Sequence, residues 1–281
     1  MSLELRITLL VLLAAFLHAV WNALVKTDTD RTLTLGLLSL LSTAVALATV
    51  PFVPVPPQAV WGYLALGVAF HLAFKVCLLQ AYRAGDLSHV YPLARGTAPL
   101  LVWLASGALA GEAPRGLDAV GVGMISLGIL SLTFDRGIPR RAEWRPVGFA
   151  LATGAFVAAY TVMDGLGVRR FGHPIAYTAW LFLCDGLFFT TTALFLRRRQ
   201  LRKSFGPALL VPIGAGFISL GGYLIVVWAL SLGALASVAA LRETGVIFAA
   251  LIGTVVLREP LGGRRVFASV CVAAGVVLLN W

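Results

Sequence analysis

Residues 87–112, LSHVYPLARGTAPLLVWLASGALAGE, decide how this chain folds. The run is predominantly apolar and long enough to cross a bilayer, which needs roughly 20 apolar residues in a helix. It nevertheless carries Arg95 inside it and ends at Glu112. A charged side chain inside such a run is costly and normally faces a cavity or a partner, so the stretch predicts a membrane helix beside something polar.

A second apolar run with charged residues inside it lies in the second half of the chain, at residues 235–259, LASVAALRETGVIFAALIGTVVLRE. Arg242 and Glu243 lie inside this run, and Glu259 ends it as Glu112 ends the first. Identical residues recur 148 positions later for the part before residue 94: Ala81/Ala229, Gly85/Gly233 and Leu87/Leu235. After residue 94 they recur 147 positions later: Arg95/Arg242, Thr97/Thr244 and Glu112/Glu259. Because they fall in order, we interpret the chain as an internal duplication.

Composition excludes a soluble protein. Of 281 residues, 59% are hydrophobic and only 12% are charged, about half the usual share of a soluble domain. The net charge of +10 lies mostly in short loops between apolar runs, which favours lipid headgroups over nucleic acid as the partner. Three cysteines lie within apolar runs, without the spacing of a metal site or a disulfide framework: Cys77, Cys184 and Cys271.

The runs are too long and too uniform for barrel strands, so the predicted fold is an all-α integral membrane protein. Ten transmembrane helices are expected, at 5–25, 33–53, 58–82, 87–110, 116–134, 147–167, 174–196, 207–231, 235–257 and 264–281. The first is taken as a retained helix rather than a signal peptide, because its apolar run continues to Val25 and resembles the sixth. The connector 135–146 separates two five-helix repeats, residues 1–134 and 147–281.

Five spans per half is an odd number, so the two halves must have opposite orientations. An inverted five-plus-five repeat is typical of secondary transporters, whose sites lie near the bilayer midplane between the repeats. The loop cations concentrate on the side of the connectors Asp135–Arg145 and Arg197–Ser204, which predicts that both termini lie outside.

The helix count, the duplication and three short motifs together resemble a known family. The first span reads LHAVWNALVK, the fourth reads VYPLARGTAPLL and ends in GE, and the ninth ends in LREPLGGRR. The chain resembles, over nearly its whole length, the drug/metabolite transporter superfamily in its ten-helix EamA-like branch. The resemblance implies an inverted-repeat basket around a central cavity that exports or exchanges small metabolites or drugs, without naming a substrate. It also implies cytoplasmic termini, opposite to the charge distribution, so the orientation stays open.

Arg95 is the first candidate for substrate binding. Its guanidinium can hold a carboxylate or phosphate through paired hydrogen bonds, or it can form a structural ion pair with Glu243. Tyr91 precedes it by one turn and shares its face. Pro92 and Pro99 remove backbone donors and free carbonyl groups that can line a cavity.

Arg242 and Glu243 are neighbours, so on a regular helix they point about 100° apart. We expect Glu243 to pair with Arg95 across the two halves while Arg242 faces the cavity. Proton coupling through Glu243 is the alternative.

Further candidate substrate-binding residues lie on spans one, three and seven. His71 and Lys75 share a face of span three, and Asp185 lies at the middle of span seven without a nearby cation in sequence. Span one presents a polar-aromatic stripe of His18, Trp21 and Asn22. We expect Tyr160 and Asp164 to mark the end of span six at the interface, and Glu112 and Glu259 to have structural roles at the membrane surface.

The predicted function is secondary transport of a small polar metabolite, such as an amino acid or organic acid, in a bacterial inner membrane. The excess of cations among the candidate residues favours a carboxylate-bearing substrate. The alternatives are a flippase for a charged lipid headgroup and an intramembrane enzyme, although neither a clustered nucleophile nor paired carboxylates are present. No cofactor, metal or nucleic acid is predicted, while proton coupling and homo-oligomer formation stay open.

Overall fold

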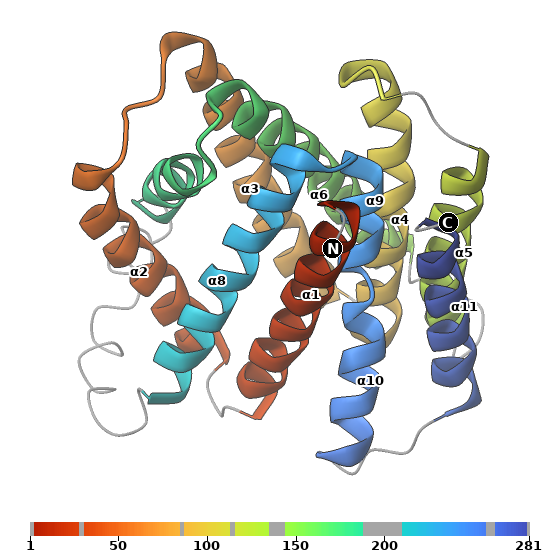
Figure 1. Ribbon diagram of the computed structural model, residues 1–281. Helices are drawn as coiled ribbons and strands as arrows, with labels where there is room; N and C mark the ends of the chain where they lie inside the picture. Colours follow the sequence, from red (N-terminus) through yellow and green to blue (C-terminus); the bar gives the residue numbers. More distant parts are fainter. Residues whose placement is uncertain are drawn as a thin grey trace.

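A computed structural model describes residues 3–27, 31–84, 87–112, 116–134, 144–187, 210–256 and 262–279, and every regular element in these ranges is a helix (Figure 1). The expectations for Glu259 and for most of the two long connectors fall outside these residues. The first half supplies α1 (Leu3–Thr27), α2 (Arg31–Thr49), the 3-10 turn η1 (Val50–Phe52), α3 (Gln58–Ala84), α4 (Leu87–Leu109), α5 (Gly116–Ser131) and the 3-10 turn η2 (Leu132–Phe134).

The second half supplies α6 (Trp144–Phe171), the helical residues 174–187, α8 (Leu210–Leu232), α9 (Leu235–Arg242), α10 (Gly245–Val255) and α11 (Gly263–Leu279). Each expected span overlaps at least one of these elements. α6 extends beyond the expected 147–167 at both ends. The described parts of the chain therefore confirm an all-helical protein.

The expected span at 235–257 is present as an apolar segment, but its helix is interrupted. The segment forms two helices, α9 and α10, joined at Glu243 and Thr244. At the joint, backbone hydrogen bonds connect residues three positions apart. The Glu243 amide donates to the Ala240 carbonyl at 3.0 Å, and the Thr244 amide donates to the Leu241 carbonyl at 3.1 Å. Such 3-10 turns interrupt the regular helical rotation. The interruption lies at the residues that carry charge in this segment.

Five helical segments in the described ranges are long and apolar enough to cross a membrane: Leu3–Leu24, Gln58–Ala81, Trp144–Phe171, Val211–Leu232 and Leu235–Val255. Shorter apolar helices occupy Leu37–Phe52 and Gly116–Ser131. The protein is thus a multi-pass integral membrane protein. α4 is not among the five, because Arg95 and two prolines lower the mean hydropathy of its described residues.

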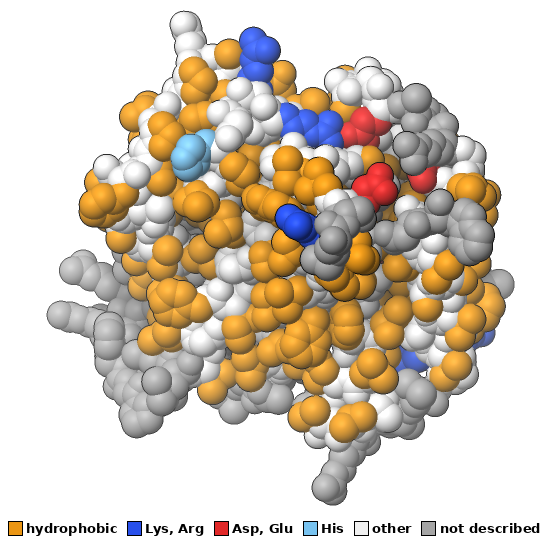
Figure 2. Space-filling view, in the orientation of Figure 1, with side chains coloured by type: hydrophobic (Ala, Val, Ile, Leu, Met, Phe, Trp, Pro, Cys, Tyr) orange, Lys and Arg blue, Asp and Glu red, His pale blue; other side chains and the backbone are white. Residues whose placement is uncertain are grey.

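The surface is suited to lipid. Large apolar side chains are exposed on several helices, including Leu9, Leu47, Leu79, Leu104 and Phe267. Hydrophobic side chains cover most of the face shown in Figure 2. Lipid tails are as apolar as these side chains, so exposing leucine to lipid costs no hydrophobic free energy.

The helices pack in pairs that join the two halves. α1 lies beside α8, and α3 packs along α6 (Figure 1). α4 contacts α6 as well as its neighbour α5, and α5 packs against α11 at one flank of the molecule. The largest buried apolar cluster draws on both halves: Val11, Leu64, Val162, Leu181 and Leu230 are among its members. Helices in lipid associate through close packing and polar contacts, so buried polar pairs between the halves carry particular weight.

Candidate functional site

Arg95 and Glu243 form an ion pair between α4 and the α9–α10 joint. The Nε atom of Arg95 lies 2.9 Å from Oε2 of Glu243, and the exposed fractions of the two side chains are 13% and 1%. The expected pairing between the halves is therefore present in the structure. Tyr91 lies one turn before Arg95 on the continuous helix α4 and is partly buried.

Arg242 reaches the same carboxylate, contrary to the expectation that it faces away from Glu243 into a cavity. Its Nε lies 3.8 Å from Oε1 of Glu243, and the side chain is buried. The expected separation of about 100° assumes a continuous α-helix. The 3-10 joint that begins at Glu243 breaks that assumption and lets sequence neighbours share one partner.

This group, which we call the arginine cluster, consists of Arg95, Arg242 and Glu243. Two guanidinium groups face one carboxylate, so the cluster carries one net positive charge. Neither carboxylate oxygen of Glu243 receives a well-aligned hydrogen bond from the described residues. Glu243 is therefore held by charge at ion-pair distance, without the fork-to-fork geometry that makes an arginine–carboxylate pair strong.

His18 on α1 lies within electrostatic range of both arginines. Its ring accepts a hydrogen bond from Trp21 Nε1 at 3.2 Å, and its backbone carbonyl accepts one from Asn22 Nδ2 at 2.7 Å. Trp21 packs against Leu38 on α2 and Ala215 on α8. Of the predicted stripe, the structure places only His18 within reach of the arginine cluster. The polar groups of Trp21 and Asn22 bond within α1.

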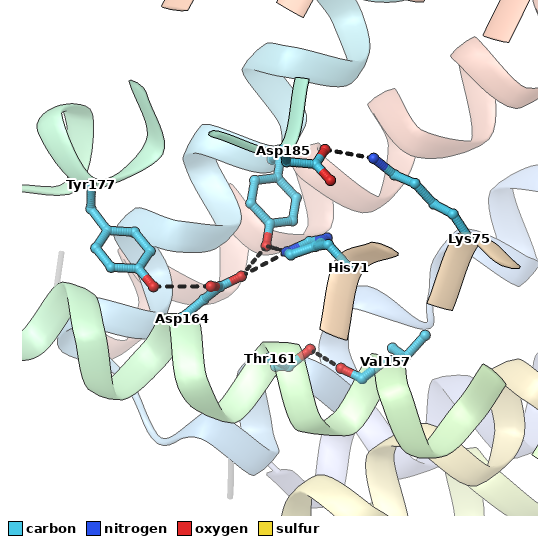
Figure 3. A network of polar contacts seen from close by, with 8 residues as sticks. His71, Lys75, Val157, Thr161, Asp164, Tyr177 and Asp185 are labelled. Carbon is cyan, nitrogen blue, oxygen red and sulfur yellow. Dashed lines mark hydrogen bonds and ion pairs between the residues drawn. The ribbon is translucent and has the colours of Figure 1, made fainter. Parts of the chain in front are cut away.

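Lys75 and Asp185 form a second ion pair between the halves. Nζ of Lys75 lies 2.5 Å from Oδ2 of Asp185, and the exposed fractions of the side chains are 25% and 9% (Figure 3). Lys75 comes from α3 and Asp185 from the helical residues 174–187. Asp185 therefore obtains from a distant helix the cation that its own segment lacks.

Asp164 lies in the interior, so the prediction that it marks an interface was wrong. Its side chain is fully buried. It accepts a hydrogen bond from the Tyr177 hydroxyl at 3.0 Å on one oxygen, and from the Tyr223 hydroxyl at 2.5 Å on the other. His71 Nε2 lies 3.0 Å from that second oxygen (Figure 3). We call His71, Asp164, Tyr177 and Tyr223 the aspartate cluster.

Aromatic rings enclose the aspartate cluster. Tyr160 stacks on His71, with ring centroids 4.0 Å apart and planes 18° apart. Phe74 meets the edge of Tyr160, and Phe182 meets Tyr223 in the same way. The i, i+4 pair of Tyr160 and Asp164 is thus an internal feature. A carboxylate in an otherwise apolar span was the signal that sequence reasoning undervalued.

The two clusters are neighbours in the interior. Arg242 lies within electrostatic range of the Tyr223 hydroxyl, which in turn bonds to Asp164. His71 and Lys75 lie one turn apart on α3. The structure therefore joins most of the candidate residues into one polar region where the halves meet.

A further polar contact closes one end of the helix body. Gly111 adopts a positive φ of 65° just after α4, which turns the chain and places Glu112. Both oxygens of the Glu112 carboxylate accept from the Leu235 amide at the start of α9, at 3.1 and 3.0 Å. Arg169 on α6 donates to Glu112 at 2.8 Å, and to the Leu230 and Gly233 carbonyls at 2.9 and 2.6 Å.

Glu112 thus contacts the backbone at the start of α9 and pairs with a cation on α6, which is consistent with the expected structural role. Ala234, the residue before α9, has no side chain that can cap the helix. The Glu112 carboxylate, just after α4, accepts from the first amide of α9 instead. Among the described residues, no group of three His, Cys, Asp or Glu side chains is arranged to hold a metal ion.

A groove of about 570 Å³ lies between α4 and α6, outside the polar region. Its lining is apolar apart from one hydroxyl: Thr97, Leu100, Leu101, Leu104, Leu151, Ala152 and Ala155. Leu104 and Leu151 are exposed on the outer surface, so the groove faces lipid.

Membrane-length helices from two halves, with ion pairs between those halves in the interior, define a helical membrane protein of the transporter type. The EamA-like transporter family model matches residues 144–281, which are the second half. The chain therefore belongs to the EamA-like transporter family, part of the drug/metabolite transporter superfamily.

A solved structure, described only as a crystal structure of a protein, has the same fold. The two align with a TM-score of 0.80 over 98% of this chain and 98% of that chain, at 18% sequence identity. At this identity the likeness establishes the fold alone. No curated protein matches the sequence significantly.

Proposed function

We propose that this membrane transporter moves a small carboxylate-bearing metabolite by alternating access, with Arg95 and Arg242 as the groups that bind the substrate carboxylate. The observation that carries the proposal is the arginine cluster, in which two buried guanidinium groups share one carboxylate. Two guanidinium groups side by side favour an anionic group on the substrate. An amino acid or an organic acid meets this requirement.

Glu243 takes the place of the substrate when the site is empty. It sits at ion-pair distance from Arg95 without aligned hydrogen bonds. An incoming carboxylate that forms paired hydrogen bonds with Arg95 can therefore displace it at low cost. Tyr91 and His18 flank the cluster from α4 and α1 and would contact the rest of the substrate, whereas Lys75, His71 and Asp185 would border its other side.

The two halves would rock against each other as an inverted repeat. Helix contacts between the halves are reciprocal: the first helix of one half packs along the third helix of the other, as α1 with α8 and α6 with α3. The ion pairs of Arg95, Lys75 and Glu112 all reach across the halves. A relative movement of the halves would therefore alter every one of these contacts together.

Counterflow in proteoliposomes tests this function. Purified protein would be reconstituted with four labelled probes: L-glutamate and gluconate as anions, L-alanine as a zwitterion and tetraphenylphosphonium as a cation. We expect uptake of at least one carboxylate probe by the wild type and by Arg145→Ala, a control at an exposed arginine at the start of α6. Uptake should be lost in Arg95→Ala.

Carboxylate uptake that persists in Arg95→Ala would make Arg95 structural. Uptake of tetraphenylphosphonium alone, still active in Arg95→Ala, would move the site to Glu243 and Asp185. Protein inserted in the liposomes must be equal for all variants, which quantitative gel analysis of the reconstituted vesicles establishes.

A lipid flippase is the second candidate, and the apolar groove between α4 and α6 is the observation that favours it. Thr97 on its wall lies two residues beyond Arg95. An acyl chain in the groove would bring a headgroup phosphate towards the arginine. Translocation of a fluorescent anionic phospholipid in vesicles, abolished in Arg95→Ala and absent for carboxylate probes, would select this function. An intramembrane enzyme gains no support, since the family is one of transporters.

A further inference from the structure

The aspartate cluster surrounds a fully buried carboxylate with neutral donors. Asp164 accepts from two tyrosine hydroxyls, and the remaining polar neighbour is His71 at 3.0 Å. The nearest formal cation on α3, Lys75, is already paired with Asp185. An ionised carboxylate in the interior normally has a cationic partner, since neutral donors only partly offset the loss of solvent.

The elements around His71 and Asp164 contribute several titratable or charged groups, including Tyr91 and Arg95 on α4, which packs against α6. The set also includes Lys75 on α3, Tyr160 on α6, Tyr177 and Asp185 on residues 174–187, Tyr223 on α8 and Arg242 on α9. Arg242 shares the Glu243 carboxylate with Arg95. Arg242 lies within electrostatic range of the Tyr223 hydroxyl that bonds to Asp164.

The described neighbours pack closely around the aspartate cluster. A Cβ atom at Gly67 on α3 would lie 2.6 Å from one oxygen of Asp164. Tyr160 covers the face of His71 at 4.0 Å. A proton needs no cavity, and it can be held between an imidazole and a carboxylate that are already 3.0 Å apart.

The ionised side chains of the two clusters and of the Lys75 pair sum to zero when both histidines are neutral. Lys75, Arg95 and Arg242 offset Asp164, Asp185 and Glu243. A substrate with one net negative charge, bound at the arginines, adds one negative charge to this region. Uptake of one proton by the His71–Asp164 pair restores neutrality. Substrate binding and proton binding therefore favour each other.

We propose that the His71–Asp164 pair is the proton-coupling site of this transporter, and that one proton accompanies each singly charged anionic substrate. The proton enters the pair when the anion enters the arginine cluster, giving an imidazolium that faces the carboxylate. It leaves the pair when the anion leaves. This inference rests on the proposed function, but it assigns coupling to residues that do not contact the substrate carboxylate. It also replaces Glu243 as the candidate for coupling.

Proteoliposomes loaded with the pH indicator pyranine test the proposal. L-glutamate or gluconate, whichever anion shows Arg95-dependent counterflow, is added outside, and luminal pH and label uptake are followed together. In the wild type we expect luminal acidification with uptake, and accumulation above the external concentration when an inward proton gradient is imposed. In Asp164→Asn, which mimics the protonated state, counterflow should persist at a reduced rate while acidification and accumulation are lost.

Thr161→Val is the matched control. Thr161 is buried on α6 one turn before Asp164, and its hydroxyl bonds to the Val157 carbonyl of its own helix at 2.7 Å (Figure 3). This variant should keep both acidification and accumulation. Its transport shows how much a substitution in the interior of α6 matters when the His71–Asp164 pair is left intact.

His71→Gln keeps the proposal testable if Asp164→Asn does not fold. This variant removes the imidazole ring that faces Asp164, so accumulation driven by a proton gradient should be lost while counterflow remains measurable. Acidification that persists in Asp164→Asn, or an unchanged pH dependence of accumulation in His71→Gln, would overturn the assignment. Wild-type uptake without any luminal pH change would overturn it as well. Absence of anion counterflow in the wild type would instead remove the proposed function itself.

Discussion

Nη2 of Arg169 lies 2.8 Å from Oε1 of Glu112, although 57 residues separate the two in the sequence. The pair joins the end of α4 in the first half to the end of α6 in the second. The same carboxylate accepts from the Leu235 amide, and the same guanidinium donates to the Leu230 and Gly233 carbonyls. One pair of side chains thus satisfies the backbone at both sides of the turn between α8 and α9. This contact also holds the three helix ends together.

Glu112→Gln should weaken this end of the molecule only modestly. Both side chains are partly exposed, at 19% and 29%, so loss of the ion pair costs about 1 kcal/mol or less. Glutamine keeps an oxygen for the Leu235 amide. Thermal unfolding in detergent, followed by tryptophan fluorescence, should show a small decrease in Tm.

Arg169→Ala should lower Tm more than Glu112→Gln, because it also leaves the carbonyls of Leu230 and Gly233 without their donor. If the two variants have equal Tm values, the backbone contacts of Arg169 contribute nothing to stability. Arg170→Ala, at the exposed neighbouring position, is the control.

Glu243→Gln should increase the affinity for an anionic substrate. The change removes the internal carboxylate that competes with the substrate for Arg95 and Arg242. We expect the KM for the transported carboxylate probe to decrease about tenfold, which corresponds to about 1.4 kcal/mol. Initial rates of counterflow at increasing probe concentrations give this value.

The same variant should be less stable without substrate, because two buried cations then repel each other. Addition of the carboxylate probe should restore Tm. A raised KM together with an unchanged Tm would show that Glu243 does not occupy the substrate position.

Asp185→Asn should destabilise the protein by about 3 kcal/mol, because it removes the buried carboxylate charge that faces Lys75. The double variant Lys75→Met/Asp185→Asn should regain most of that loss, since no buried charge remains unpaired. Denaturant unfolding of the wild type, both single variants and the double variant gives the coupling energy. Additive effects of the two changes would show that the pair makes no specific contribution.

Gly67→Ala and Gly62→Ala should change stability in opposite directions, although both lie on α3. A Cβ at position 67 would lie 2.6 Å from Asp164, whereas nothing lies within 4 Å of one at position 62. Overpacking at 67 costs about 1–3 kcal/mol. Alanine at 62 gains about 0.5–1 kcal/mol from helix propensity. Equal Tm values for the two variants would contradict the close packing around Asp164.

Sequence reasoning succeeded where the signal was a long apolar run or a charge inside one. The helical fold and the partnership of Arg95 with Glu243 both follow from such signals. It failed at Asp164 because the end of span six was placed at residue 167, whereas α6 continues to Phe171. A difference of one turn moved this carboxylate from the membrane surface into the interior.

The sequence by itself determined that the chain is a duplicated helical membrane protein with charge at its centre. This holds because apolar length, hydropathy and repeated motifs are local properties, and lipid permits few alternatives to a helix. Only the tertiary structure decided which charges meet. The joint at Glu243 turns Arg242 and Arg95 onto one carboxylate, and the packing of α3 on α6 brings His71 to Asp164. Partners such as His71 and Asp164, which are 93 residues apart, are chosen by helix packing, which no local pattern in the chain encodes.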